Sequence, residues 1–201
     1  MSAPCRSSEA CRLGPAARAR AFLVSLIRPL GLSFSLSLGL GLALVLPARA
    51  ALPAAYQPVV IESGASGRTE FDLTAALERA RREKRRLYVY LGASDCPYCR
   101  KYEAFLARNA QELQPHFAGW LVVDLRSSLQ IQASKLFFKV GERSLGYVDF
   151  QKSIGDERAR LLVYPSVWLF DTQLKPLMQM PAGTGTFETV AEQLEILNLV
   201  Q

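Results

Sequence analysis

Hydrophobic residues recur at helical spacing in three stretches of the chain. In the first stretch, the hydrophobic residues stand at positions i, i+3, i+4 and i+7. Thr69 with Asp72 resembles a capping box just before them, so the pattern predicts a helix over residues 70–85. The positions are Leu73, Ala76, Leu77 and Ala80. The same spacing continues from residue 98 to residue 113 and predicts a second helix, and a third match predicts a closing helix over residues 187–197.

Short runs of β-branched and aromatic residues alternate with these helices and predict strands. Residues 87–91 are apolar on both faces, as in a strand buried inside a sheet, and residues 117–125 predict a second buried strand. Residues 161–170 predict a strand that a proline interrupts at its start, and residues 176–180 an edge strand. Residues 126–160 are less regular, favouring a helix over 131–140 and a loop with at most a short strand over 141–155. This alternation of helices and strands indicates an α/β domain.

The first fifty residues have the composition of an export signal. Arginines precede an uncharged apolar run over residues 29–46, and Ala48 and Ala50 form a small-residue exit, so we expect a signal peptide that is cleaved after Ala50. An uncleaved anchor is the alternative, because the charge-free stretch is long enough to span a bilayer. Residues 51–68, rich in Pro, Gly and Ala, then predict an N-terminal lead-in to a domain over residues 69–201.

Most of the excess positive charge belongs to this leader. The 201 residues include 24 Lys and Arg against 18 Asp and Glu, a formal charge of +6. Within residues 1–50 the arginines are opposed by Glu9 alone, so the remainder of the chain is nearly neutral. The remainder therefore gives no indication of a nucleic-acid partner. A hydrophobic share of 50% also excludes a disordered or low-complexity chain.

Cysteine usage is the sharpest chemical signal in the sequence. Of four cysteines, Cys5 and Cys11 lie in the leader, which leaves Cys96 and Cys99 as the only thiols after residue 50. A structural disulfide stabilises more when it closes a longer loop, and a bridge across two residues closes almost none. The pair therefore points to redox chemistry rather than to a structural crosslink.

The position of the pair sets different roles for the two thiols. A buried strand runs through a short turn into Cys96, which stands where the free N–H groups and the positive end of a helix dipole favour a thiolate. Pro97 suits the first helical position, where a missing N–H is tolerated. Cys99, one turn on, faces the core and can attack only a sulfur already joined to Cys96. We therefore expect Cys96 to be the nucleophile and Cys99 the resolving thiol.

Two segments carry a resemblance to exported thioredoxin-like proteins. Residues 75–103 resemble their opening, with an amphipathic helix, a buried strand and the redox motif Cys96-Pro97-Tyr98-Cys99, and residues 164–171 resemble the loop that holds a cis-proline against the disulfide. The resemblance implies a thioredoxin fold, a central mixed β-sheet flanked by helices. It also implies that Pro165 packs beside Cys96 and that the Tyr164 backbone binds a substrate peptide, with Pro97 and Tyr98 as further candidate contacts.

The chain departs from this pattern at three places. Pro97-Tyr98 is similar to the dipeptide of glutaredoxins, which suggests a less reducing potential than that of thioredoxins. Thioredoxins bury an acid six positions before the first cysteine, where this chain has Tyr90, so proton transfer at Cys99 needs another group or water. Residues 126–160 lengthen the path from Cys99 to Pro165, and we interpret them as an insertion between the second core strand and the cis-proline strand that selects substrates.

Other uses of the cysteine pair were weighed against this interpretation. A zinc site requires four ligands, whereas the chain after residue 50 offers two cysteines and His116, so we expect no metal and no other cofactor. A non-redox binding or chaperone module with the same fold, and a dithiol oxidase, remain alternatives, and glutathione use is a further option. We expect a monomeric periplasmic thiol–disulfide oxidoreductase that reduces protein disulfides and is itself kept reduced by a membrane thiol carrier, because similar exported thioredoxins work in this way.

Overall fold

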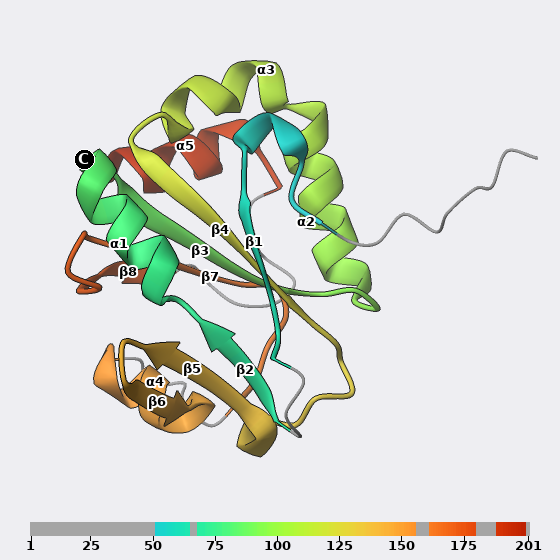
Figure 1. Ribbon diagram of the computed structural model, residues 1–201. Helices are drawn as coiled ribbons and strands as arrows, with labels where there is room; N and C mark the ends of the chain where they lie inside the picture. The colour runs from blue at the N-terminus through green and yellow to red at the C-terminus, as the bar shows by residue number, and fades with distance from the viewer. Residues whose placement is uncertain (1–50, 65–67, 156–160, 180–187, 200–201) are drawn as a thin grey trace, which may run out of the picture. The chain divides into compact units, whose positions relative to one another are not determined.

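The computed structural model describes residues 51–64, 68–155, 161–179 and 188–199 (Figure 1). The expected signal peptide with Ala50 at its end, and Phe187 at the start of the expected closing helix, lie outside the described residues. Within the described ranges, no helix combines the length and the apolar character that a membrane crossing requires.

A five-stranded mixed sheet forms the centre of the described fold. Its strand order is β1-β4-β3-β7-β8, in which β1, β4 and β3 run parallel while β7 and β8 are each antiparallel to the preceding strand in that order. The strands span Val59–Glu62 (β1), Arg86–Ala93 (β3), Trp120–Ser127 (β4), Ser166–Phe170 (β7) and Pro176–Gln179 (β8). The strand predicted over residues 87–91 lies within β3, whereas β4 begins at Trp120 rather than at residue 117 and β7 begins only after Pro165; the predicted edge strand is confirmed as β8.

Helices pack on both faces of this sheet. The α-helices span Thr74–Glu83 (α1), Pro97–Arg108 (α2), Ala110–Leu113 (α3), Tyr147–Ser153 (α4) and Val190–Leu199 (α5), and 3₁₀ turns span Ala54–Tyr56 (η1), Gln114–Phe117 (η2) and Ala133–Lys135 (η3). Because side chains alternate along a strand, Leu87 and Val89 of β3 pack in one buried cluster with α1, whereas Tyr88 and Tyr90 pack in the other with α2 and α5. A central mixed sheet flanked by helices is the thioredoxin fold expected from the sequence.

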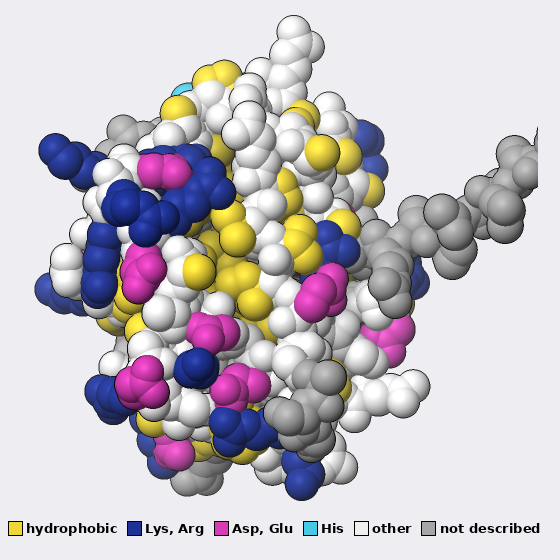
Figure 2. Space-filling view, in the orientation of Figure 1, with side chains coloured by type: hydrophobic (Ala, Val, Ile, Leu, Met, Phe, Trp, Pro, Cys, Tyr) yellow, Lys and Arg dark blue, Asp and Glu magenta, His cyan; other side chains and the backbone are white. Residues whose placement is uncertain are grey.

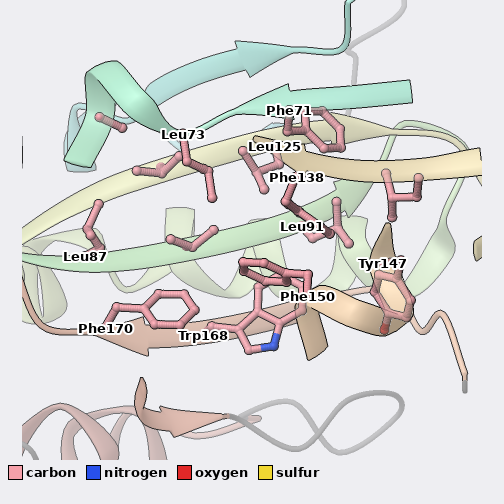
Figure 3. Packing of buried hydrophobic residues seen from close by; sticks show 14 of the residues in the cluster. Phe71, Leu73, Leu87, Leu91, Leu125, Phe138, Tyr147, Phe150, Trp168 and Phe170 are labelled. Atoms are coloured by element: carbon pink, nitrogen blue, oxygen red, sulfur yellow. The ribbon is translucent and has the colours of Figure 1, made fainter. Parts of the chain in front are cut away.

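The interpreted insertion, residues 126–160, contributes two strands to a second sheet. This three-stranded sheet has the order β2-β5-β6 and spans Thr69–Asp72 (β2), Leu136–Val140 (β5) and Arg143–Gly146 (β6). The short strand expected within residues 141–155 is present as β6, but the helix α4 takes the place of the rest of the predicted loop. The prediction of a helix over residues 131–140 is wrong, because Leu136 and Phe138 alternate with less buried residues and β5 pairs with β2 and β6. Phe138 then stacks on Phe150 of α4, with ring centroids 4.3 Å apart, and faces Trp168 of β7 (Figure 3).

The N-terminal boundaries also differ from the prediction. Residues 59–62 form β1 and pair in parallel with β4, so the central sheet begins before the predicted domain boundary at residue 69. Thr69 and Asp72 belong to β2 and form no capping box; the helix starts at Thr74, whose N–H donates to Asp72 Oδ1 at 2.9 Å. Parallel pairing of β2 with β5 explains this difference, because the sequence gives no sign of that distant partner.

The C-terminal end of α1 is strongly basic. Lys and Arg side chains gather over this end of the helix in Figure 2. Cations are favourable near a helix C-terminus, where the dipole is negative. Several are also engaged within the fold, since Arg79 pairs with Glu83 at 2.7 Å and Arg81 Nε donates to the Thr172 carbonyl at 2.9 Å.

Candidate active site

Cys96 stands at the junction between β3 and α2, as the sequence predicts. It is the N-cap of α2, with an extended backbone, and Pro97 follows at the start of the helix. The Cys96 Sγ accepts a hydrogen bond from the Cys99 N–H at 3.2 Å, so one otherwise unpaired donor at the helix start points at the sulfur. Only 1% of Cys96 is exposed, and a substrate disulfide can therefore reach Sγ only if neighbouring residues move.

Cys99 lies one turn further along α2 and is completely buried. Both cysteines are free thiols, and Cys99 Sγ accepts a hydrogen bond from the Ala93 N–H at 3.4 Å. Burial raises the pKa of the Cys99 thiol well above its ordinary range. Cys99 is therefore a thiol rather than a thiolate near neutral pH, and any reaction that uses its sulfur as a nucleophile must first move its proton.

The loop before β7 lies against the first cysteine. The Tyr164–Pro165 peptide bond is cis, and the Cys96 thiol donates a long hydrogen bond to the Tyr164 carbonyl, with Sγ and oxygen 3.8 Å apart. The Tyr164 hydroxyl is bonded to Ser127 Oγ at the end of β4 at 2.7 Å, and its burial raises the pKa of Tyr164 to about 12. The start of α2, the end of β4 and the start of β7 thus meet around Cys96.

The two residues between the cysteines are exposed. Tyr98 is 45% exposed and its ring makes a cation–π contact with Lys101, whose Nζ lies 5.6 Å from the ring centroid. Pro97 is exposed as well. Tyr98 therefore does not pack into the core, and both residues present their side chains on the surface beside the buried sulfur.

The turn before Cys96 is tied to the start of the interpreted insertion. The Asp95 carboxylate accepts hydrogen bonds from the Leu129 N–H at 2.8 Å and from the Ser128 hydroxyl at 3.1 Å. The bond from the Leu129 backbone is the main reason why the pKa of Asp95 lies below its usual range. Residues that follow β4 are thereby held next to the cysteine motif.

Tyr90 and Glu103 are the part of the site that sequence reasoning missed. The Tyr90 hydroxyl, on β3, donates to Glu103 Oε1 at 2.7 Å, and its interaction with the Cys99 thiol affects the pKa of both groups. Glu103 follows Cys99 by four residues, the spacing that places two side chains on the same face of a helix. That spacing is the one signal in the sequence by which Glu103 could have been found.

Two buried carboxylates lie on this side of the central sheet. Glu103 is 7% exposed and Asp124 of β4 is completely buried, and burial is the main cause that raises the pKa of each. Asp124 Oδ2 accepts from the Leu52 N–H at 3.1 Å and pairs with Arg126, and Glu103 is hydrogen-bonded to the Ala51 backbone. The first residues after the expected cleavage site thus contact both acids.

No group of three or more His, Cys, Asp or Glu side chains gathers in the described part of the chain in a way that could hold a metal ion. His116 lies exposed in η2.

Comparisons with known proteins give solved structures only. No family model matches the chain, and no curated protein matches it. The structure of a thioredoxin-fold protein from Helicobacter pylori has 15% identity and a TM-score of 0.40, covering 59% of this chain and 70% of that chain. A putative thiol:disulfide interchange protein DsbE from Chlorobium tepidum has 17% identity and a TM-score of 0.35, covering 60% and 84%.

A third similar structure is the exposed lipoprotein thioredoxin Etrx1 from Streptococcus pneumoniae, with 15% identity and a TM-score of 0.32, covering 60% of this chain and 89% of that chain. With TM-scores of 0.40 or less and identities of 17% or less, these likenesses carry no information about the substrates or partners of this chain.

Proposed function

We propose that this protein is a thiol–disulfide oxidoreductase that exchanges disulfides with protein substrates through Cys96 and Cys99. The observation that carries the proposal is the placement of two free thiols on the first turn of α2, with a backbone N–H directed at Cys96 Sγ and the Tyr164–Pro165 loop against it. A hydrogen-bonded sulfur at a helix N-terminus is a thiolate-stabilising environment.

In this mechanism the Cys96 thiolate attacks a substrate disulfide. A bond forms between Cys96 Sγ and one substrate sulfur, and the other substrate sulfur leaves with the electron pair and takes a proton. Cys99 then attacks Cys96 Sγ, which releases the second substrate thiol and leaves a Cys96–Cys99 disulfide. The buried position of Cys99 supports this order, because its sulfur can reach only a partner already held at Cys96.

We infer that the protein acts as a reductant of exported proteins. The apolar leader with its small-residue exit supports export to the periplasm, where we propose that it is removed after Ala50, and the reductant role follows the resemblance to exported thioredoxins. Regeneration then requires an electron donor, for which we propose a membrane thiol carrier. The second sheet is proposed to select substrates, because its chain is anchored beside the motif through Asp95 and Leu129.

The direction of electron flow is tested by the equilibrium redox potential of the pair, measured against a dithiol/disulfide buffer. A potential of about −250 mV or lower supports the reductant, whereas about −120 mV indicates an oxidant of newly exported proteins. A pair that does not cycle at all would contradict the redox function.

The mechanism itself is tested by trapping. We expect Cys99→Ser to accumulate mixed disulfides with proteins of the same compartment, since Cys96 can attack but nothing resolves the product. Cys96→Ser is the matched control and should trap none. If Cys96→Ala instead retains the binding of unfolded substrate proteins, the chain is a non-redox binding module.

A further inference from the structure

Cys99 needs a proton acceptor, and the described core holds few candidates. The thiol is completely buried and stays protonated near neutral pH, yet resolution of a mixed disulfide requires its sulfur as a nucleophile. The group that contacts it is the Tyr90 hydroxyl, which is buried as well and donates in turn to Glu103 Oε1 at 2.7 Å. The Tyr90 hydroxyl thus lies between the Cys99 thiol and a buried carboxylate.

The position of the Tyr90 ring depends on Gly92. These two residues lie on the same face of β3, and a Cβ at position 92 would stand 2.5 Å from Tyr90 Cε1 and 2.7 Å from its hydroxyl oxygen. No other residue type leaves that space without moving the ring. Gly92 therefore lets the ring lie back along the strand, so that its hydroxyl lies between Cys99 and Glu103.

We propose that Tyr90 and Glu103 form a buried proton-transfer pair for Cys99: Tyr90 is a catalytic residue that accepts the thiol proton, and Glu103 is the positioning residue that receives the phenol proton. The proposal rests on the proposed function, because it concerns the second step of that reaction. The proposal extends the proposed function by assigning the acid–base group that the cysteine motif lacks.

Atoms and electrons balance in this step. Cys99 Sγ bonds to Cys96 Sγ, and the substrate sulfur leaves Cys96 with the electron pair of the broken S–S bond. The Cys99 proton moves to the Tyr90 oxygen while the Tyr90 proton moves to the Glu103 carboxylate. The two cysteines are oxidised and the substrate disulfide is reduced, with no further reactant.

The surroundings of Glu103 suit it as a base. Burial, with the nearby charge of Asp124, raises the pKa of Glu103 above its ordinary value, and hydrogen bonds from Tyr90 and the Ala51 backbone act in the opposite direction, as does the charge of Arg126. Tyr90 faces it from β3, and Asp124 and Arg126 face it from β4. A carboxylate with a raised pKa holds a proton more readily than an exposed one, which suits a proton acceptor.

The test separates the two chemical steps by using a small aromatic disulfide, 5,5′-dithiobis(2-nitrobenzoate), on the reduced protein. Attack by Cys96 releases one thionitrobenzoate, and attack by Cys99 on the resulting mixed disulfide releases the second. Cys5 and Cys11 are replaced by Ser in every sample, because leader thiols would react too. The rates of both phases are followed by stopped flow across a range of pH.

We expect Tyr90→Phe and Glu103→Gln to slow the second phase by about 100-fold near neutral pH, the lower end of general-base effects. The first phase should not change. The two changes together should slow the second phase no more than the worse single change, because the residues act as one unit. In Glu103→Gln, the rise of this rate with pH that accompanies ionisation of Glu103 should also be absent.

Tyr88→Phe is the matched control. Tyr88 lies on the same face of β3 and is equally buried, but its hydroxyl is bonded to the Tyr102 hydroxyl, so its loss removes a buried hydrogen bond away from Cys99. It should leave both phases unchanged. A second phase that Tyr90→Phe leaves unaltered, or that Tyr88→Phe slows equally, would overturn the proton-transfer pair. A parent protein that shows no first phase would instead overturn the redox function itself.

Discussion

Phe138 provides a direct test of whether the second sheet is part of the same cooperative core as the cysteine-bearing sheet. The side chain is 1% exposed, stacks on Phe150 of α4 and meets the Trp168 ring edge-on, with centroids 6.1 Å apart. It therefore joins β5 to β7, the strand that follows the Tyr164–Pro165 loop (Figure 3). Phe138→Ala removes this aromatic link.

The expected loss follows from the burial. A fully buried Phe replaced by Ala loses its transfer free energy and leaves a cavity, which together lower the free energy of unfolding by about 3–5 kcal/mol. Domains of this size have a total of roughly 5–15 kcal/mol, so the variant should remain folded in water but unfold at much lower urea concentration. Urea denaturation followed by tryptophan fluorescence measures the difference, since Trp168 reports on the contact.

Phe137 is the matched control in the same strand. It is half-buried on the opposite face of β5 and has the Arg68 guanidinium 4.5 Å from its ring centroid. Phe137→Ala should lower the free energy of unfolding by only about 1 kcal/mol, the size of an exposed cation–π contact and some lost apolar burial. Equal losses for the two variants would refute the reasoning. So would two separate urea transitions in Phe138→Ala, because the second sheet would then unfold alone.

Two further predictions concern the buried acid next to Tyr90. Because the pKa of Glu103 is raised in the folded state, the folded protein binds this proton more tightly than the unfolded chain does. The parent protein should therefore lose stability as the pH rises from about 4 through the raised pKa. Glu103→Gln should lack this loss, which urea titrations at several pH values measure. If the leader is removed after Ala50, as proposed, the new α-ammonium group of Ala51 lies beside Glu103 and lowers the pKa of its carboxyl. A chain that begins at Ala51 should therefore lose stability at a lower pH than a chain with extra residues before Ala51. Identical profiles for the two chains would contradict the second prediction.

The central strands and the redox motif could be predicted because their signals are local. Residues 87–91 are apolar on both faces, and such a run is compatible with few structures other than a buried strand. The start of α2 was predicted from the periodicity behind Cys99 and from Pro97, both of which are also local. What these elements share is that their own residues determine their structure.

The elements that were missed depend on distant partners. Residues 59–61 are a run of only three apolar residues, followed by Glu62, and only pairing with β4 makes residues 59–62 a strand. The hydrophobic residues within 136–140 fit the spacing of a helix as well as that of a strand, and pairing with β2 makes the segment a strand. β2 itself was assigned to a helix because its partner lies more than sixty residues further along the chain. Tertiary pairing overrides local propensity in all three cases.

The site shows the same limit in its chemistry. In the sequence, Tyr90 stands where the resemblance implies a buried acid, so the sequence showed no proton acceptor for Cys99. The structure places a carboxylate, Glu103, on α2 one turn after Cys99 instead, and the Tyr90 hydroxyl reaches it from β3. Recognising this requires knowing that Gly92 leaves room for the ring, which is a property of the folded strand and not of the composition.

This arrangement has a consequence for how the two thiols are controlled. An acid on the strand would place its charge directly against the resolving thiol, whereas Tyr90 keeps the Glu103 carboxylate one hydrogen-bonded group away. Electrostatic interaction weakens with distance, so ionisation of Glu103 changes the charge felt at Cys96 less than a strand acid would. Proton transfer at Cys99 can then respond to pH without altering the nucleophile. The two phases of the disulfide reaction should accordingly have different pH profiles, and a shared profile would indicate that one titrating group governs both.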